Sequence, residues 1–411
     1  MRILVQKFGG TSVADIDRLK MVRGKVKAAL DQGYKVVVVL SAKSGKTNKL
    51  LDLSTRWAAE PDLAEVDSLL STGEQASIAL FSMLLKDSGI KARSMLGWQI
   101  PIITNDEFGR ARILSIDASR IHKELEAHDV LVVAGFQGST EDGRITTLGR
   151  GGSDTSAEVG HALAAALHAD ACEIYTDVDG VYTTDPNLCS TARKLDRVTY
   201  EEMLEMASMG AKVLQIRSVE FAKKYNVPVH VRSTFSDDPG TLVAQEDAMM
   251  EAVLVSGIAY DKDQARVTVC GVPDRPGVSA ALFAPLSENG IMVDMIIQTA
   301  SREGVTDMTF TVSRKDLEKA IQLMKEIVAR IGGTGVEHDP YVAKVSVIGV
   351  GMRNHTGVAT KAFAALQQEN INIQMISTSE IKISCLIDEK YTELAVRTLH
   401  DAFELHKPDH A

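Results

Sequence analysis

An internal repeat near the C-terminus limits the possible folds more than any other feature of this sequence. ARVTVCGVPDRPGVSAALFAPLSENGIMVDMII begins at Ala265, and AKVSVIGVGMRNHTGVATKAFAALQQENINIQMI begins at Ala343. Gly271 in the first copy matches Gly349 in the second. Six further identities follow at a constant spacing: Gly277, Phe283, Leu286, Ile291, Met295 and Ile296 match Gly357, Phe363, Leu366, Ile371, Met375 and Ile376. Each copy has the order strand, glycine-containing loop, helix, strand, further strand, second helix. This order predicts two small ferredoxin-like βαββαβ sandwiches.

Residues 1 to about 235 have a different pattern, in which short apolar strands alternate with helices. The strand-like runs are RILVQ (2–6), KVVVVL (35–40), DVLVVAG (129–135), ACEIYT (171–176) and VPVHV (227–231). Near-continuous apolar strands separated by helices predict an α/β fold with a mostly parallel sheet sandwiched by helices. Ligands of such sheets bind beyond the carboxyl ends of the strands.

Composition excludes several classes of protein. A chain of 411 residues is expected to form two or three domains, and a formal net charge of −10 argues against a nucleic-acid partner. Four cysteines without C-x-x-C spacing predict reduced thiols and no metal site. No signal-like or membrane-length apolar run is present, so we expect a cytoplasmic protein without a membrane partner.

Two glycine-bearing turns follow the first two predicted strands. In KFGGTS (7–12), the glycines let a phosphate approach the backbone, Lys7 adds charge, and Thr11 or Ser12 could cap the next helix. A structural Gly-Gly turn with a surface lysine is an equally good reading. The second turn, SAKSGKTN (41–48), is not a P-loop, because Leu40 stands where that motif needs glycine.

Three further segments carry candidate chemistry. In RGGSDT (150–155), the arginine can hold a carboxylate or phosphate in bidentate fashion, whereas helix capping explains only Ser153 and Asp154. YTDVDGVYTTDP (175–186) lacks the later glutamate of a calcium loop, which leaves a nucleotide pocket or ordinary turns. Glu74 follows a glycine expected to break a leucine-rich segment; it could accept from a ligand ammonium or act as a first-turn helix acid.

Together these motifs resemble the aspartokinases of the amino-acid-kinase superfamily. KFGGTS, SAxxGxTN, STGE (71–74), GRGGSDT (149–155), YTDVDGVYTTDP and GAKVLQIRS (210–218) occur in that family's order, and the repeats resemble its paired ACT regulatory modules. The resemblance covers nearly the whole chain. It implies a catalytic domain at 1–245, a linker and strand at 246–263, a first ACT module at 264–338 and a second at 339–411.

The resemblance implies transfer of the ATP γ-phosphoryl group to L-aspartate, the first step toward lysine, threonine, methionine and diaminopimelate. The implied catalytic residues are Lys7, Arg150 and Asp154. Those implied to bind aspartate are Ser41, Thr47, Glu74, Arg150, Gly151, Gly152 and Ser153. Those implied to bind the nucleotide are Lys7, Phe8, Gly9, Gly10, Ser41, Ser153, Thr176, Asp177, Tyr182, Asp185, Pro186, Asn187 and Lys212. Mg²⁺ is expected to arrive with ATP, without a protein ligand that we can name.

The resemblance also implies feedback inhibition by lysine, threonine or both, bound to ACT modules that pair between subunits of a homo-oligomer. In the first copy the expected effector residues are Asp274, Arg275, Pro276, Gly277, Val278, Ser279, Met292, Val293, Asp294 and Gln298. In the second copy they are Val358, Ala359, Asn372, Ile373, Ser379 and Glu380. There Arg353-Asn354-His355 replaces the acidic loop, which predicts weak effector binding by that copy.

Two further expectations concern the region before the repeats. Residues 251–261 are expected to form a strand of the second module, with the first module inserted after it. Met249-Met250 is a possible internal start for a short subunit, although a methionine pair can also occur there by chance.

Two other functions fit parts of the pattern. One is a different amino-acid kinase, acting on acetylglutamate or carbamate; the other is an amino-acid sensor with an inactive kinase-like domain. STGE and the appended repeats favour aspartate as substrate, and the presence of Lys7, Arg150 and Asp154 argues against an inactive domain.

Overall fold

The computed structural model describes residues 1–149, 153–209, 213–251, 253–301 and 303–408. Contacts between residues divide the chain into two units. The first comprises Met1–Val181 and Lys194–Met250, and the second comprises Tyr182–Arg193 and Glu251–Ala411. The short segment Tyr182–Arg193 therefore belongs with the C-terminal repeats.

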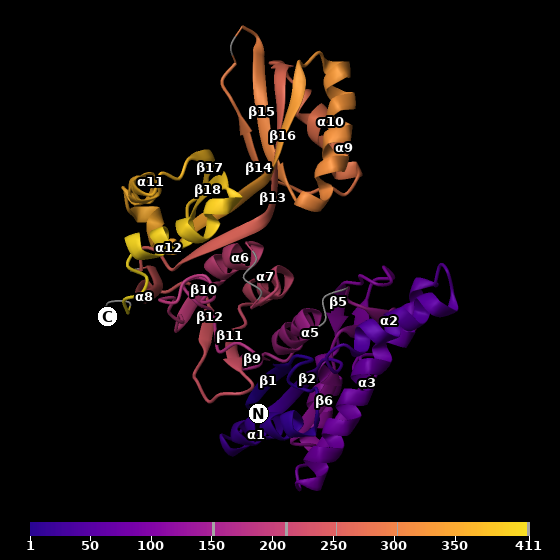
Figure 1. Cartoon of the computed structure of the whole chain (residues 1–411). Helices are drawn as coiled ribbons and strands as arrows, with labels where there is room; N and C mark the ends of the chain where they lie inside the picture. The colour runs from indigo at the N-terminus through magenta and orange to yellow at the C-terminus, as the bar shows by residue number, and fades with distance from the viewer. Residues whose placement is uncertain (150–152, 210–212, 252, 302, 409–411) are drawn as a thin grey trace. The chain divides into compact units, whose positions relative to one another are not determined.

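An eight-stranded sheet forms the centre of the first unit (Figure 1). Its order is β10 (Arg197–Thr199), β12 (Thr241–Ala244), β11 (Val229–Ser233), β9 (Ala171–Thr176), β1 (Ile3–Phe8), β2 (Lys35–Leu40), β6 (Val130–Ala134) and β3 (Ala92–Met95). All neighbours are parallel except β11 and β12. This confirms the predicted mostly parallel sheet, and the valines of β2 are fully buried because helices cover both faces.

Helices α1 (Ile16–Asp31) and α3 (Leu63–Asp87) cover one face of this sheet, and their apolar stripes share a core with β1, β2 and β6. Helices α5 (Ser153–Ala166) and α7 (Ile216–Tyr225) pack together on the other face, where α5 contacts β1, β2 and β9. The remaining helices of the unit are α2 (Lys46–Trp57), α4 (Ala118–Ala127), α6 (Tyr200–Ser208) and α8 (Ala248–Glu251). A smaller sheet has the order β5 (Ile113–Ile116), β4 (Ile102–Thr104), β7 (Gln137–Ser139), β8 (Ile145–Thr147).

The second unit contains one antiparallel six-stranded sheet. Its order is β14 (Val293–Gln298), β15 (Val305–Val312), β13 (Gly257–Pro273), β16 (Gly335–Ile348), β18 (Lys382–Asp388) and β17 (Ile373–Thr378). The two central strands each serve both repeats. Residues Gly257–Asp261 pair with Lys344–Ile348, and Arg266–Cys270 pair with Gly335–Asp339. The first half of β13 thus lies beside the second module's part of β16, and it begins at Gly257, later than the expected start at residue 251.

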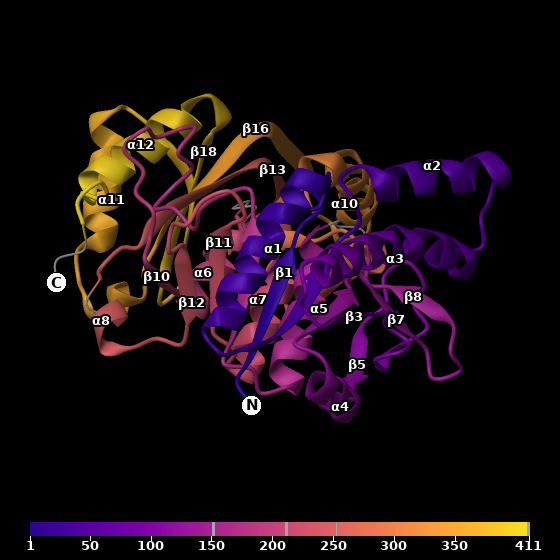
Figure 2. The ribbon, with the colours of Figure 1, turned by 90° about the horizontal axis from the view of Figure 1, so that it is seen from below.

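Each module carries two helices on one face of its part of the sheet. Helices α9 (Val278–Glu288) and α10 (Leu317–Ile331) lie against the first module's strands (Figure 1), and α11 (Val358–Gln368) and α12 (Thr392–Ala402) lie together in the second (Figure 2). Each pair encloses its own apolar core. Short 3₁₀ turns occur at η1 (Arg314–Asp316), η2 (Val350–Asn354) and η3 (Glu389–Tyr391).

The repeat extends to the backbone of the glycine loops. Gly277 precedes α9 with φ 93°, and Gly357 precedes α11 with φ 95°. Glycine adopts this left-handed conformation without the cost that a side chain brings. Among the described residues, no helix combines the length and apolarity that crossing a lipid bilayer requires.

Candidate active site

A cavity of about 260 Å³ opens in the first unit where β1, β2 and β9 end. Its lining residues are Gly9, Gly10, Thr11, Ser41, Ala42, Lys43, Ser44, Gly45, Thr47, Asn48, Glu74, Thr176 and Asp177. Seven of them, from four separate motifs, are residues that the sequence analysis assigns to aspartate or nucleotide. The cavity lies beyond the carboxyl ends of parallel strands, where ligands of such sheets bind.

Direct backbone contact holds the first two turns together. A Cβ atom on Gly10 would lie 2.8 Å from the carbonyl oxygen of Ala42, so only glycine fits without displacing the backbone. The Ser44 N–H donates to the Gly10 carbonyl (3.2 Å), and the Ser41 N–H donates to the Phe8 carbonyl (3.2 Å). The Gly-Gly turn therefore forms one wall of the cavity together with the Ser41 turn.

Helix α1 is capped by Asp15, whose carboxylate accepts from the Arg18 N–H at 2.9 Å. The expectation that Thr11 or Ser12 caps this helix is wrong, because the helix begins later than the turn suggests. Ser12 instead hydrogen-bonds Thr234 at 2.7 Å, and Thr11 lines the cavity.

Helix α2 begins at the cavity. Its N-cap is Gly45, with φ 73° and no side chain to satisfy the first-turn amides. Thr47 and Asn48, in the first turn, line the cavity. Free N–H groups and the helix dipole favour an anion at such a terminus.

Glu74 is the buried carboxylate of this site, with 2% of its surface exposed. One oxygen, Oε1, accepts from the Ala42 N–H at 3.0 Å, while Oε2 is buried with no hydrogen-bond partner among the described residues. Burial raises the pKa of Glu74 to about 7, against the lowering effect of the Ala42 hydrogen bond. A buried acceptor without a partner is costly, and a cationic ligand would satisfy it.

Gly73, the residue before Glu74, does not have the helix-breaking role that the sequence predicts. Gly73 lies inside α3, so both the predicted helix break and the first-turn position of Glu74 are wrong. A Cβ atom on Gly73 would lie 2.8 Å from the Ala42 Cβ. The glycine is needed for close packing of α3 on the Ser41 turn, not to end a helix.

Lys7 and Phe8 are buried residues of β1, with 3% and 0% of their surface exposed. The reading of Lys7 as a surface lysine is therefore wrong. The Phe8 ring stacks on the Tyr175 ring, with 4.6 Å between the ring centroids.

Burial, assisted by the Lys7 charge, lowers the pKa of His161 to about 3 despite a hydrogen bond to Ser218.

Several predicted residues cannot be placed. Arg150, Gly151, Gly152 and Lys212 lie outside the described residues. Ser153 and Asp154 begin α5, but their side chains also lie outside the description. The roles implied for all six stay predictions.

The nucleotide residues fall in two units. Thr176 and Asp177 line the cavity, and the Thr176 hydroxyl donates to Asp177 at 3.0 Å. Tyr182, Asp185, Pro186 and Asn187 belong to the second unit. There Asp185 accepts from the Asn187 N–H (2.9 Å) and from the Tyr260 hydroxyl (2.9 Å), so its carboxylate orders a turn.

Lys43, Ser44 and Asn48 also line the cavity, although the motifs predict no role for them. All three stand in the SAKSGKTN turn, so their position between Ser41 and Thr47 was the available signal. Lys43 brings a cation to a wall otherwise dominated by backbone and hydroxyl groups.

The predicted effector residues differ between modules. In the first, Asp274, Arg275 and Gly277 form an exposed loop before α9. Asp294 is instead ion-paired with Lys344, a buried residue of β16. In the second module, Glu380 lies 3.6 Å from Arg353.

The other predicted positions divide by exposure. Pro276, Ser279, Met292, Gln298, Asn372 and Ser379 are exposed, whereas Val278, Val293, Val358, Ala359 and Ile373 are buried or half-buried.

Comparisons with known proteins agree with this architecture. The amino acid kinase family model matches residues 2–233, and ACT domain models match residues 266–329 and 345–403. An aspartate kinase of Stutzerimonas stutzeri is 54% identical over 409 residues, covering 99% of this chain and 98% of the relative.

Two solved structures of E. coli aspartokinase III are 29% identical to this chain, and the matches span 98% of this chain and 99% of each structure. One contains aspartate and ADP (TM-score 0.76), and the other contains lysine and aspartate (TM-score 0.75). The matches extend over the cavity, the glycine turns and both repeats, and on these grounds the chain belongs to the aspartokinase family, with an amino acid kinase domain followed by two ACT domains.

Proposed function

We propose that this chain, as an aspartate kinase, carries out its reaction in the cavity between the Gly10 turn and Glu74. The γ-phosphoryl group of ATP passes to the side-chain carboxylate of L-aspartate, giving ADP and 4-phospho-L-aspartate. The proposal rests on Glu74 Oε2, a buried oxygen that has no hydrogen-bond partner among the described residues and that a ligand ammonium would satisfy.

Glu74 binds the α-ammonium group of aspartate. The approaching positive charge lowers the pKa of the carboxyl, so the ionised form becomes the stable one in the complex. Arg150 holds a carboxylate of aspartate in bidentate fashion. Ser41, Thr47 and the Gly151–Ser153 segment line the same substrate.

The phosphates lie over the first turn. The N–H groups of Phe8, Gly9 and Gly10 and the positive end of α2 face them, while Lys7 and Lys212 neutralise their charge. Thr176 and Asp177, at the cavity wall, bind the adenosine side. The nucleotide roles proposed for Tyr182, Asp185, Pro186 and Asn187 concern residues of the second unit and stay predictions. The Asp177 carboxylate at the cavity wall is an oxygen donor of the type that Mg²⁺ prefers and would help to hold the ion that accompanies ATP, which would add charge neutralisation.

The chemical step needs positioning rather than a general base. An aspartate side-chain carboxylate is already ionised at pH 7, so one of its oxygens attacks the γ-phosphorus directly. The bond from that phosphorus to the β–γ bridging oxygen breaks, and the electron pair leaves with ADP. Asp154 orients the reacting groups, and the fixed charges stabilise the transferring phosphoryl group.

The test is ADP release with L-aspartate, N-acetyl-L-aspartate and N-acetyl-L-glutamate as acceptors. We expect turnover with L-aspartate only, because the acetylated compounds lack the ammonium group. Glu74→Gln should raise the KM for L-aspartate roughly 100-fold and leave the KM for ATP nearly unchanged, since a charged hydrogen bond is lost. Glu65→Gln, an exposed acid on the same helix, is the matched control. An unchanged KM in Glu74→Gln would refute the assignment.

A regulatory role for the first ACT module accompanies this proposal. The exposed Asp274 carboxylate binds the ammonium group of lysine, threonine or both, and the amides at the start of α9 bind the carboxylate. Support comes from Gly277, which offers no capping side chain, and from the relative whose structure contains lysine. Initial rates measured across lysine and threonine concentrations, singly and paired, test the choice of effector.

The ACT modules also provide the surface for a homo-oligomer. Strands β14 and β17 are the two edges of the six-stranded sheet. Each exposes an isoleucine at the matched repeat position, Ile296 (53%) and Ile376 (42%). Edge strands with exposed apolar side chains favour pairing with a second chain. Light scattering of the full chain and of Ile296→Lys tests this; a monomer in both cases would contradict it. An internal start at Met249 or Met250 stays a prediction.

A further inference from the structure

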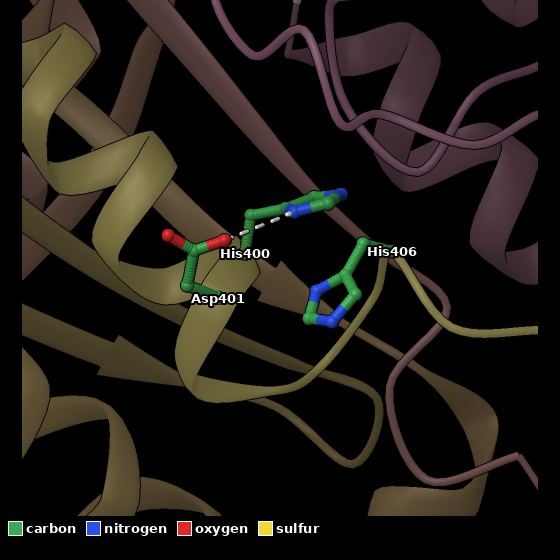
Figure 3. Close-up of side chains that lie close together, drawn as sticks. All are labelled: His400, Asp401 and His406. Carbon is green, nitrogen blue, oxygen red and sulfur yellow. Dashed lines mark ion pairs between the residues drawn. The ribbon is translucent and has the colours of Figure 1, made fainter.

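Three side chains gather at the C-terminal end of α12 in the second unit: His400, Asp401 and His406 (Figure 3). One ring nitrogen of each histidine and one Asp401 oxygen all lie within 4.8 Å of one another. None of them takes part in the proposed kinase chemistry or in effector binding.

His400 is the fixed member of this cluster. Its side chain is fully buried, and its Nε2 is hydrogen-bonded to the Thr183 hydroxyl at 2.9 Å. Its Nδ1 is also buried but has no hydrogen-bond partner among the described residues, and it lies 4.0 Å from an oxygen of Asp401. A buried polar atom of this kind calls for an explanation, because leaving it without a partner costs free energy.

We propose that His400, Asp401 and His406 bind a divalent transition-metal ion of the zinc type. Two imidazoles and one carboxylate are a donor set that Zn²⁺ accepts, with water in the fourth position. In the tautomer that binds metal, His400 carries its ring proton on Nε2, which donates to the Thr183 hydroxyl oxygen and leaves the Nδ1 lone pair for the metal. A second hydrogen bond made by the non-ligating nitrogen is the usual support of a metal-bound histidine.

The spacing requires only a small adjustment. Donor atoms of a tetrahedral zinc site lie about 3.4 Å apart, closer than the 4.8 Å limit of the present cluster. Asp401 and His406 are both exposed, so their side chains can move toward His400 without disturbing the core. The Arg193 charge near His400 opposes a cation, and the Asp401 carboxylate offsets it.

The metal would act on the segment Tyr182–Arg193 through Thr183. The Thr183 carbonyl accepts from the Ile258 N–H (2.7 Å), and its hydroxyl accepts from the Arg193 N–H (3.0 Å). A metal on Nδ1 makes the Nε2–H a stronger donor and so tightens this segment on the second module. This consequence rests on the proposed function, because Tyr182 and Asp185–Asn187 are proposed nucleotide residues; the metal site itself does not.

The test is a Zn²⁺ titration of the full chain, freed of purification-tag histidines and stripped with EDTA, against a chromophoric chelator and without nucleotide. We expect one Zn²⁺ per chain with a dissociation constant below about 1 μM, and a higher melting temperature in the bound state. His406→Gln and Asp401→Asn change exposed residues, so both variants should fold, and each should weaken binding at least 10-fold.

His338→Gln is the matched control, because His338 is an exposed histidine of the same unit with acidic neighbours on either side. It should bind zinc like the parent chain. Less than half an equivalent of bound zinc, or equal affinity in His406→Gln, Asp401→Asn and the parent, would overturn the site. Turnover with L-aspartate, measured on the same variants, keeps this outcome separate from failure of the proposed function.

Discussion

The cavity of the first unit and the proposed effector loop of the first ACT module share two features in different surroundings. In each, a left-handed glycine precedes a helix N-terminus, Gly45 before α2 and Gly277 before α9, and an acidic side chain stands nearby. Glu74 is 2% exposed, and one of its oxygens has no hydrogen-bond partner in the part of the chain that the structure describes, whereas Asp274 is open to solvent. Water screens the second charge but not the first, so equal ligand contacts should be worth more in the cavity.

The largest effect is expected where the cavity backbone is tightest. Gly10→Ala would bring a methyl group within 2.8 Å of the Ala42 carbonyl and separate the two turns. Turnover should fall about 100-fold, because displaced groups no longer align the reactants. Gly24→Ala in α1, where an added Cβ meets nothing within 4 Å, should leave turnover intact and increase stability by up to about 1 kcal/mol. Steady-state kinetics measures turnover, and urea unfolding measures stability. An equal loss of turnover in Gly10→Ala and Gly24→Ala would contradict the interpretation that the Gly10 turn is in tight contact with Ala42.

A pH series tests the buried carboxyl. Burial raises the folded-state pKa of Glu74 from 4.5 to about 7, so the folded protein holds this proton between these values while the unfolded chain has lost it. Stability of the ligand-free protein should therefore fall by about 3 kcal/mol as pH rises from 4.5 to 7. In Glu74→Gln, the unfolding free energy measured with urea should no longer show this fall between pH 4.5 and 7.

The same titration has an effect on substrate binding. Below pH 7 the protonated carboxyl no longer attracts an ammonium group, so the KM for L-aspartate should rise as pH falls. A KM that is flat from pH 6 to 8 in the parent chain would count against the assignment.

A smaller effect is expected at the exposed acid of the first module. Asp274→Asn should raise the effector concentration for half-inhibition about 10-fold and leave uninhibited turnover unchanged. In the second module, Glu380→Gln should change the effector concentration for half-inhibition less than 2-fold, because Glu380 is already ion-paired with Arg353. Equal shifts in the two variants would show that both copies bind effector alike.

The smallest difference is expected between the two glycine loops themselves. Gly277 and Gly357 have φ of 93° and 95°, with open space around each, so alanine at either position carries only backbone strain. Each substitution should cost about 1 kcal/mol in unfolding free energy. A difference above about 1 kcal/mol between them would show that the modules are not equivalent in backbone.

Local patterns predicted the fold well because they act at short range. The repeat positioned both ACT modules, and the valine-rich runs predicted the parallel sheet. Pairing of Gly257–Asp261 with Lys344–Ile348 followed only from the family resemblance, since no local pattern specifies a partner strand more than 80 residues away.

The site was less predictable where packing overrides local preference. Gly73 resembles a helix breaker, yet α3 continues through it, and a side chain at this position would clash with Ala42. The partner of Asp294 is Lys344, 50 residues away, and no spacing rule connects them. His400 likewise depends on Thr183, 217 residues earlier in the chain.

A crystal structure of the full chain with L-aspartate and ADP would test the role of Glu74 most directly. We expect the aspartate ammonium nitrogen about 3 Å from Glu74 Oε2 and the ADP phosphates over the Gly9–Gly10 amides. Aspartate bound with its ammonium group away from Glu74, and Oε2 still without a partner, would contradict the account.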